Sequence, residues 1–529
     1  MRYECDVLVI GGGGAAVRAA VEAAHNQTKV IMVDKGSFGR SGTSPLALHG
    51  FAATLHRDDY EETLVADILR TGCNINDVNL VHTAARESRQ EVALLEKLGV
   101  RFLRNADGSY YIYGGGGHSV PHNIIVDEAS NGVSPVVLLG MEAWKKGVRL
   151  IDGVMITDLL IDNGHAVGAI GIDREQRIHT FSAGAIVLAA GGANRAYPNV
   201  VPRISHPMYG TTGDGYVLAL QAGLALVDME FVNFRDSPPA TPIHGTYVNA
   251  KGERFMARYD PIRKEGAPRG KVVEALFREM QAGNGPIHIE IDAKESDAFD
   301  FLAEEYKSYV RATREGKRPP VTITFQRVLG GARMNPDASS EIEGLYIAGE
   351  NAGGFHGADR LQGAAFLETQ VFGRLAGMNA ALFARSRTPK ELSKGLLESP
   401  RERIRKISER TEGPRAADLM KKVQTVTWDY GSIVRKASGI KKGLAGLGEI
   451  REELGKAVGG NPFEVLEVSA LALTAETILR SALAREESRG THLRNDFPDS
   501  KEAMARKHIC LRCDTQGALQ VSVVPSHPG

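Results

Sequence analysis

The sequence predicts an α/β fold built from a core domain with a parallel sheet, an inserted α+β domain and a C-terminal helical domain. Residues 7–10 and 30–33 are unbroken apolar runs, as expected of parallel strands buried on both faces, and helical spacing separates them. Prolines, dense charge and short strands mark the insertion, and beyond residue 385 the pattern is helical. The expected boundaries are 1–235 and 326–385 for the core, 236–325 for the insertion, and 386–529 for the helical domain and tail.

The turn after the first apolar run carries small residues at the spacing G-x-G-x-x-G/A. Gly11 lets the chain turn, Gly13 lets a pyrophosphate approach the backbone, and Ala16 seats the next helix closely on the strand. The start of that helix offers free N–H groups and a positive dipole end to phosphates. Asp34 ends the second run where an acid accepts bonds from a ribose hydroxyl. These features predict a Rossmann-like domain that binds a dinucleotide, rather than a glycine-rich turn that binds nothing.

Composition excludes several other classes of protein. The formal net charge of the 529 residues is zero, so no global field favours nucleic acid or an anionic membrane surface. Four scattered cysteines, and a first strand that begins without a charged and apolar leader, favour the cytoplasm. No apolar run approaches the roughly 20 residues that span a bilayer. Membrane association is therefore expected only through a partner protein.

Between residues 36 and 122, loops alternate with helices. Residues 36–50 form a Gly- and Ser-rich loop that either wraps a cofactor or is solvated. Residues 60–98 have the apolar spacing of two helices with a break at 73–77, and a hairpin is expected around Asp107 and Gly108. The next loop carries His118, Ser119 and His122, where surface histidines and cofactor or substrate contacts are equally expected.

The later core repeats the strand pattern. Residues 148–172 read as two strands turned at Asn163 and Gly164, and residues 183–190 as a buried strand that runs into Gly191 and Gly192. A strand ending in two glycines indicates a second close approach of backbone to the cofactor. Asp214 is placed to cap a helix over residues 216–222. Strands are also expected at 344–350 and, as the only one in the tail, at 518–524.

Motifs distributed over nearly the whole chain point to one family. They are, in order, IGGGGAAVRAA (10–20), GGHSVP (116–121), TGDG (212–215), MEFVNF (229–234), GERFMARYDP (252–261), APRGKVV (267–273), LYIAGENAGGFHGADRL (345–361) and EESRGTHLRNDFP (486–498). Together these motifs resemble those of the flavoprotein subunits of succinate dehydrogenase and fumarate reductase, with L-aspartate oxidase as a near relative.

This resemblance implies that the bound dinucleotide is FAD. It places Gly11, Gly13, Gly14 and Ala15 at the pyrophosphate, Asp34 and Lys35 near the adenosine, Ser41 and Thr43 beside the flavin, Asp214 on the flavin side, Glu350 at the ribityl chain, and Ala365 and Phe366 in the same cofactor site. The chemistry implied is hydride exchange between flavin N5 and a carbon next to a carboxylate.

Two arginines match the family's substrate residues. Arg360, in GADRL, matches the arginine that clamps a substrate carboxylate, for which a planar bidentate fork is well suited. Arg269, in APRG, matches the arginine that moves a proton to or from the substrate carbon. That second role comes from the resemblance, because a guanidinium is a poor acid on general grounds. Surface ion pairs are the alternative for both.

The chain departs from the family pattern at several positions. The family's S-H-T, whose histidine bonds the flavin, is Ser41-Gly42-Thr43 here, so the FAD is expected to be non-covalent. Arg235-Asp236-Ser237 replaces H-P-T, and Gln326 replaces a second substrate histidine, which makes Arg235 and Gln326 candidate substrate contacts. Arg235, Arg327 and Arg333 either add positive charge to the pocket or form surface ion pairs, and the surface interpretation is favoured for each.

The resemblance also implies partners. A small carboxylic acid is the expected substrate, and a possible electron-transfer partner is an iron–sulfur subunit, with neither nucleic acid nor direct membrane insertion. The alternatives are an amino acid oxidase like aspartate oxidase and an electron-transfer protein with a vestigial pocket. Cys510 and Cys513 have the spacing of half a metal site or of a redox pair, but a pair without function is favoured and no metal site is predicted, because a full metal site needs more ligands than the chain offers nearby.

Overall fold

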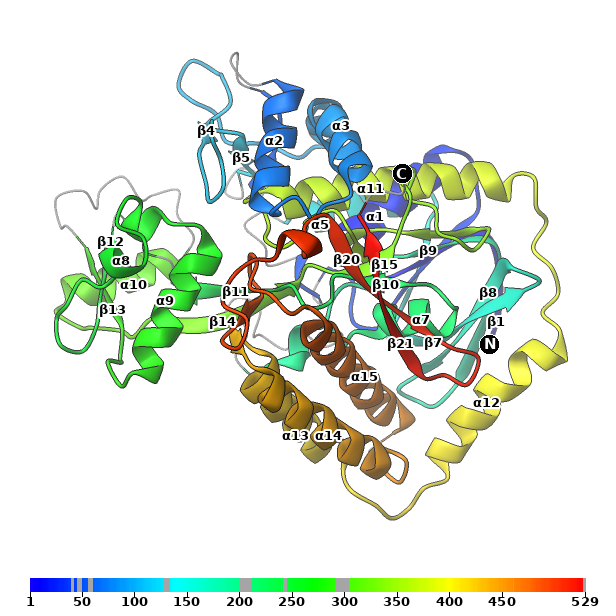
Figure 1. Cartoon of the computed structure of the whole chain (residues 1–529). Helices are drawn as coiled ribbons and strands as arrows, with labels where there is room; N and C mark the ends of the chain where they lie inside the picture. The colour runs from blue at the N-terminus through cyan, green and yellow to red at the C-terminus, as the bar shows by residue number, and fades with distance from the viewer. Residues whose placement is uncertain are drawn as a thin grey trace.

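The computed structural model describes residues 1–39, 42–44, 50–55, 60–127, 134–198, 211–238, 240, 245–291, 304–459 and 461–526. Figure 1 shows a central body, a green lobe at the left and a group of orange helices below. The lobe joins the body through β11 (Val232–Ser237) and β14 (Thr322–Val328), which pair antiparallel. The predicted α/β class is therefore confirmed.

The body is built on one mixed sheet with the strand order β6-β2-β1-β9-β8-β7, with β16 paired to β9. Its strands are β1 (Arg2–Ile10), β2 (Val30–Asp34), β6 (Arg149–Asp152), β7 (Val154–Asp162), β8 (His165–Asp173), β9 (Ile178–Leu188) and β16 (Leu345–Ile347). In the parallel centre, Val9 pairs with Met32 on one side and Val187 on the other. Val7, Leu8 and Val9 are fully buried, which explains their unbroken apolar run.

Two helices pack directly against each other on this sheet. Helix α1 (Gly14–His25) follows β1, and the long helix α11 (Ala364–Ala384) crosses it at the top of Figure 1. A side chain on Gly377 would collide with the backbone of Ala19, and one on Gly373 would begin 2.7 Å from the carbonyl oxygen of Ala15. Small residues on both helices therefore allow the close approach that fixes the start of each helix.

An ionic network ties this helix pair to α3 (Val78–Lys97). The two carboxylate oxygens of fully buried Glu91 accept bonds from Arg18 Nε at 2.6 Å and Arg374 Nε at 2.9 Å. The outer nitrogens of the same arginines reach Glu22 at 3.0 Å and Glu87 at 2.7 Å. Glu91, together with Glu22 and Glu87, thus neutralises two cations from different helices.

The lobe holds the inserted segment. It contains β12 (Gly245–Val248), α8 (Met256–Tyr259), α9 (Arg269–Gln281), β13 (His288–Ile291) and α10 (Glu304–Arg314), with α5 (Pro135–Lys145) and α7 (Asp214–Gln221) remaining in the body. The predicted boundaries at 235/236 and 325/326 fall inside β11 and β14. The domain division therefore stays a prediction, and these two strands carry residues from body to lobe.

The N-terminal layer and the later hairpins follow the sequence pattern. Helices α2 (Glu61–Thr71) and α3 are separated by the predicted break, with β3 (Gly50–Ala52), β4 (Ile112–Tyr113) and β5 (Asn123–Ile125) beside them. Asn163 and Gly164 have φ values of 50° and 80°, as the tight turn between β7 and β8 requires. Gly108, at φ 85°, turns the predicted hairpin. These predictions are confirmed.

The C-terminal part contains a strand that the sequence did not predict. Helices α12 (Lys394–Ser408), α13 (Ala416–Gly431), α14 (Ala437–Leu454) and α15 (Pro462–Ala484) are followed by β20 (Lys507–Cys513) and β21 (Leu519–Pro525), with short β18 (Val434–Arg435) and β19 (Leu493–Arg494) between. The expectation of a single tail strand is wrong, because β20 pairs with β10 (Leu226–Val227), about 280 residues earlier. One of its buried positions is polar His508, which bonds Asp228 at 2.7 Å. The strand therefore lacks the regular apolar pattern by which strands are predicted from sequence.

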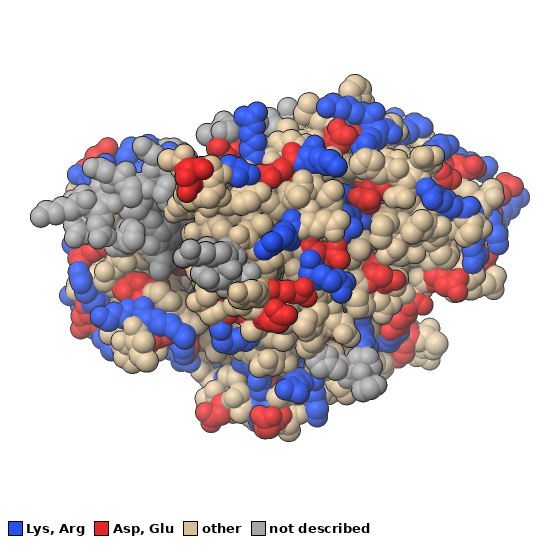
Figure 2. All heavy atoms as spheres, turned by 90° about the horizontal axis from the view of Figure 1, so that it is seen from above, with Lys and Arg blue, Asp and Glu red and all other residues tan. Residues whose placement is uncertain are grey.

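The sheet that β20 joins has the order β17-β15-β10-β20-β21, with β15 (Gly331–Arg333) and β17 (Ala352–Gly353). On the face in Figure 2, basic and acidic side chains alternate over the described surface without a large patch of one sign. Within the described ranges, no helix is long and apolar enough to cross a membrane.

Candidate active site

The turn between β1 and α1 has the geometry of a phosphate cradle. Gly11 has φ 124°, and a side chain there would collide with the carbonyl oxygen of Ala189, so only glycine fits. Gly13 caps α1 without a side chain, and a Cβ at that position would have only Ser44 Oγ near it, at 3.3 Å. Gly14 N donates to the same Ser44 Oγ at 3.0 Å, and Ala15 follows in the first turn. The open space at Gly13 and a helix start without an N-cap side chain fit a pyrophosphate.

Asp34 and Lys35 lie at the end of β2, beside this turn. A side chain on Gly12 would begin 2.5 Å from Asp34 Oδ2, so glycine here leaves room for the carboxylate. Lys35 Nζ lies 2.5 Å from Asp214 Oδ2 and 3.0 Å from Glu467 Oε1 of α15, and it donates to Thr212 Oγ1 at 2.7 Å. Burial alone would lower the pKa of Lys35, but the two carboxylates more than offset it and raise the pKa.

The predicted capping role of Asp214 is wrong. Helix α7 begins at Asp214 itself, its N-cap is Gly213 at φ 83°, and no side chain caps it. The Asp214 carboxylate instead pairs with Lys35 and accepts the Thr212 hydroxyl at 2.8 Å, because a buried lysine needs a countercharge. Burial raises the pKa of Asp214. The residue therefore lies at the nucleotide-binding edge, where it was expected as a cofactor contact.

The remaining cofactor candidates line the same edge of the sheet. Thr43 Oγ1 accepts from Asn194 Nδ2 at 3.3 Å, whereas Ser41 lies outside the described residues. Glu350 follows β16, and its Oε1 accepts Val328 N at 3.3 Å. Burial raises the pKa of Glu350 to about 7. The Gly191-Gly192 turn meets this carboxylate, since a side chain on Gly192 would collide with it.

A second helix start faces this edge. Ala365 and Phe366 lie in the first turn of α11, whose N-cap is Gly363 at φ 84° without a side-chain bond. Among the described residues, buried Thr211 Oγ1 and Asn194 Oδ1 have no hydrogen-bond partner. Two open helix starts, an acid at the end of β2 and unsatisfied polar atoms lie together at the carboxyl ends of parallel strands. These residues fit a bound dinucleotide such as FAD.

The candidate substrate residues converge on one side chain. Arg269 begins α9 in the lobe, Gln326 lies on β14, and Arg360 follows the 345–359 segment in the body. Arg269 Nη1 donates to Gln326 Oε1 at 3.0 Å, and Arg360 Nη2 reaches the same oxygen at 3.4 Å. Tertiary structure thus brings together three of the four predicted catalytic positions.

Neither guanidinium group makes direct contact with a carboxylate in the described part of the chain. Among the residues that the structure describes, neither Arg269 nor Arg360 forms an ion pair with a carboxylate, and the Arg360 guanidinium otherwise donates only to Leu361 O, at 3.4 Å. Burial, with the charges of Arg269 and Arg327, lowers the pKa of Arg360 to about 9. Two neighbouring guanidinium groups without a direct carboxylate partner form an anion-binding arrangement.

The surface interpretation of Arg235 and Arg327 is wrong. Arg235 is only 9% exposed on β11, and its Nε donates to Asp236 O at 3.1 Å. Arg327 is 6% exposed, and its Nη2 donates to Glu368 Oε2 at 3.1 Å. Arg333 lies elsewhere, since its charge acts on Cys510. Arg327 is therefore neutralised beside the site, and Arg333 is not part of it.

Sequence reasoning missed the acid that neutralises Arg327. Fully buried Glu368, in α11, accepts from Arg327 and also contacts His356 Nε2 at 3.0 Å. Burial, reinforced by the charges of Arg327 and Arg360, outweighs the Glu368 charge and lowers the pKa of His356 to about 4. A lone acid within the apolar run of residues 364–373 was the available signal, since buried carboxylates require partners.

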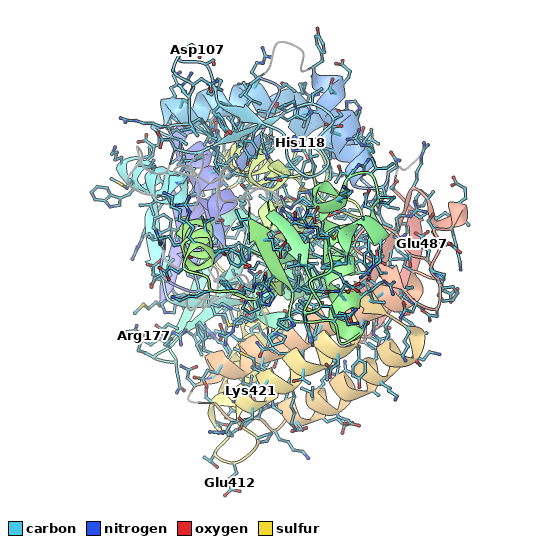
Figure 3. The ribbon with its side chains drawn as sticks, turned by 90° about the vertical axis from the view of Figure 1, so that its left-hand side faces the viewer. Asp107, His118, Arg177, Glu412, Lys421 and Glu487 are labelled. Carbon is cyan, nitrogen blue, oxygen red and sulfur yellow. The ribbon has the colours of Figure 1, made fainter. Side chains whose placement is uncertain are left out.

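The loop that carries His118 and His122 packs beside the segment that follows Arg360. His118 Nε2 lies 2.9 Å from Gln362 O, two residues after Arg360. His122 is fully buried and its Nε2 lies 3.1 Å from Asp67 Oδ2, so the surface interpretation is wrong for His122. Burial opposes ionisation of Asp67, but bonds from His122 and Ser119 and the charge of Arg70 lower its pKa to about 2. Figure 3 shows His118 next to the helices of the N-terminal layer.

The two tail cysteines do not form a common site. Cys510 and Cys513 are three residues apart on β20, and such residues point to opposite faces of a strand. Both thiols are free, and burial raises the pKa of each. Within the described ranges, no group of three or more His, Cys, Asp or Glu side chains could hold a metal ion. Strand geometry therefore opposes both the redox-pair and the half-site interpretation.

Because Gly42 offers no nucleophile, acid precipitation is expected to release intact FAD from the protein. The measurement is absorbance of the supernatant and of the washed, redissolved pellet at flavin wavelengths. Yellow colour that stays with the denatured chain would contradict non-covalent binding.

Comparison with known proteins agrees with this geometry. Residues 6–366 match the family model described as "FAD binding domain", and residues 420–527 match "Fumarate reductase flavoprotein C-term". The chain is 31% identical to one of the subunits of the fumarate reductase (CoM/CoB) of Methanothermobacter marburgensis, over 96% of this chain and 97% of the relative. It is 28% identical to the succinate dehydrogenase flavoprotein subunit of Rickettsia bellii, over 99% and 96%.

The fold is also that of solved relatives. A variant of FrdA from E. coli quinol fumarate reductase superposes with a TM-score of 0.90 at 24% identity, over 99% of this chain and 97% of that one. Both family models, both relatives and this fold agree with the motifs found in the sequence.

Proposed function

We propose, since this chain belongs to the fumarate reductase and succinate dehydrogenase flavoprotein family, that it is the catalytic subunit of an electron-transfer complex whose substrate is a dicarboxylic acid. Membership of the family makes the chain an FAD-dependent oxidoreductase that acts on CH–CH groups. The proposal concerns the finer points: the acid, the roles of the site residues and the electron partner.

The observation that carries the proposal is the convergence of Arg269 and Arg360 on Gln326 Oε1. An amide oxygen carries only partial negative charge, so it satisfies two guanidinium groups poorly. A carboxylate that enters between them would replace this contact with charge-assisted bonds, which are typically about twice as strong. The Arg360 fork is the better clamp, because its planar donors match a carboxylate bidentately.

Each residue then has a distinct role. Bound FAD supplies the group that exchanges a hydride with the substrate carbon. Arg360 holds one carboxylate and draws electron density from the neighbouring carbon, while Arg269 moves the proton that completes the C–H bond. Gln326 holds the two forks in register. Arg235, which is buried on β11, is the proposed contact for a second carboxylate.

The electron partner is proposed to be an iron–sulfur subunit. Relatives with matching length are named as subunits, which supports assembly into a complex. The name of the Methanothermobacter relative also includes CoM and CoB, so both compounds should be tested as electron donors. Purification of the tagged chain from its native host, with iron analysis of the co-purified proteins, tests the proposal. Recovery of the chain without an iron-containing partner would contradict it.

The direct test of substrate class is reoxidation of photoreduced protein under anaerobic conditions. Fumarate, other unsaturated dicarboxylic acids and matched monocarboxylic acids are mixed with the reduced protein, and return of the oxidised flavin band is followed. Dicarboxylic acids are expected to reoxidise it fastest. Steady hydrogen peroxide formation with aspartate in air would favour the oxidase alternative. If no acid reoxidises the flavin, the remaining alternative is an electron-transfer protein with a vestigial substrate pocket.

Replacing Arg360 with alanine is expected to weaken binding of the reactive acid about 30-fold, or about 2 kcal/mol, because a charge-assisted bidentate contact is lost. The measurement is the concentration of acid that half-saturates the rate of flavin reoxidation. Arg333→Ala is the matched control, since Arg333 lies by Cys510 outside the site. Equal affinities of Arg360→Ala and wild type would remove Arg360 from the carboxylate site.

A further inference from the structure

We propose that Asp359 is the proton relay that recharges Arg269 during turnover, an inference that rests on the proposed function and extends it. An arginine that gives a proton to carbon becomes a neutral guanidine and must regain that proton before the next cycle. Gln326, which Arg269 contacts, has no titratable proton to return. The site therefore requires an acid near Arg269, and sequence reasoning assigned none.

Asp359 occupies the required position. Its side chain is only 7% exposed, and its Oδ2 lies 3.5 Å from where a side chain on Gly270 would begin. Gly270 follows Arg269 in the first turn of α9, and its backbone N–H favours the ionised form of this carboxyl group and so opposes the rise of its pKa. Asp359 is thus held beside the helix turn that carries the proton-transferring arginine.

The remaining contacts orient the Asp359 carboxyl group, and none of them is an ion pair that would hold it permanently ionised. Oδ1 accepts Arg360 N at 2.7 Å and Asn233 Nδ2 at 3.3 Å. Burial raises the pKa of Asp359, and the charges of Arg269 and Arg360 only partly oppose this. Neither charge forms an ion pair with Asp359 within the described part of the chain. The carboxyl group is therefore suited to alternate between its protonated and ionised forms.

The other acids near the site already have hydrogen-bond or ion-pair partners. Glu368 is held by Arg327 and His356, and Glu350 lies at the cofactor edge with Val328 N on its Oε1. Another titratable group that the Asp359 charge affects is the thiol of Cys73. Burial, with a smaller contribution from that charge, raises the pKa of Cys73 to about 11, so the thiol is a poor proton source.

The C-terminal motif closes the other side of Asp359. Gly490 has φ 54°, and a side chain there would collide with the carbonyl oxygen of Ala358. Thr491 N donates to that same oxygen at 2.9 Å. Arg489 and Glu487 of this segment also act on the Cys73 thiol, and Figure 3 shows Glu487 in the red C-terminal part. Gly490 O also lies 3.6 Å from where a side chain on Gly270 would begin, so the segment lies beside both Asp359 and the first turn of α9.

The proton balance closes over one reduction. Arg269 gives one N–H proton to the substrate carbon, where the carbon's electron pair forms the new C–H bond. The neutral guanidine takes the proton of the Asp359 carboxyl group, directly or through one water. The Asp359 carboxylate then takes a proton from solvent. Oxidation of the saturated acid runs through the same steps in reverse.

The test compares photoreduced wild type with Asp359→Asn, which keeps the size and the Oδ1 acceptor but removes the acid. Reoxidation by fumarate is expected to slow about 100-fold, as for loss of a general acid, with half-saturation nearly unchanged. Reoxidation by ferricyanide, which takes electrons without protonating a carbon, is expected to stay at the wild-type rate. Wild-type reduction should fall as pH rises through the pKa of Asp359, and the variant should lose this limb.

Asp359→Ala gives an independent measurement, because formate can enter the vacated space and restore the acid. Formate is expected to recover fumarate reduction in Asp359→Ala and to leave wild type unchanged, with flavin content showing that both proteins are folded. A wild-type rate and pH profile in Asp359→Asn, or a defect in Asp359→Ala that formate does not relieve, would overturn the relay. If wild type itself reduces no acid, the proposed function fails instead.

Discussion

Replacement of Arg269 by lysine is expected to lower the turnover of fumarate about 1,000-fold, within the usual range for loss of a positioned proton-transfer group. Lysine keeps the positive charge but loses the planar fork that reaches Gln326 Oε1 at 3.0 Å. Its ammonium group therefore cannot contact Gln326 and reach the substrate carbon at the same time. The KM for fumarate should change little, because Arg360 retains the carboxylate.

The measurement is steady-state fumarate reduction with a reduced dye as electron donor, at matched FAD content. Arg278→Lys is the control, because Arg278 lies on the same helix and pairs with Glu274 at 2.8 Å away from the site. Its turnover should match wild type. If Arg269→Lys also turns over like wild type, the proton role is excluded. If the turnover of Arg360→Ala also equals that of wild type, the pocket is vestigial and the electron-transfer alternative is favoured.

Replacement of Glu91 by glutamine is expected to lower the free energy of unfolding by about 3 kcal/mol, the usual cost of removing one partner from a buried ion pair. The amide keeps the volume but leaves the buried guanidinium groups of Arg18 and Arg374 with one full countercharge fewer. Because these arginines lie on α1 and α11, the helix starts at the nucleotide edge should loosen as well. FAD release on mild heating should therefore begin at a lower temperature.

Urea unfolding followed by far-ultraviolet circular dichroism, with FAD in excess, measures the change in stability. Glu22→Gln is the matched control, because Glu22 binds Arg18 at the partly exposed end of the same network. Partly exposed pairs typically contribute about 1 kcal/mol or less, so this variant should unfold close to wild type. Equal midpoints for Glu91→Gln and Glu22→Gln would show that the buried position carries no special weight.

Local pattern was enough for the core and for the family. The run Val7–Ile10, the small residues after it and Asp34 predicted strand, turn, helix and strand because each depends on neighbours within a few residues. The same holds for the break between α2 and α3 and for the Asn163-Gly164 turn. Motifs then supplied Arg269 and Arg360, which the structure brings to one oxygen.

Patterns failed where a residue's environment comes from distant segments. β20 was missed because its partner β10 lies about 280 residues earlier, and Asp214 was misread as a cap because its ion-pair partner is Lys35. Arg235 and Arg327 were expected at the surface because arginine usually is exposed, yet both are buried.

The sequence by itself determined the dinucleotide-binding turn and the flavoprotein family, and it supplied Arg269 and Arg360 as candidate substrate residues, since each lies in a short, contiguous motif. Only the tertiary structure decided which charges meet: Glu91 with two helices, Glu368 with Arg327 and His356, and Asp359 with the first turn of α9. The physical reason is that charge–charge energy depends on distance in space and on burial, and neither is a function of spacing along the chain.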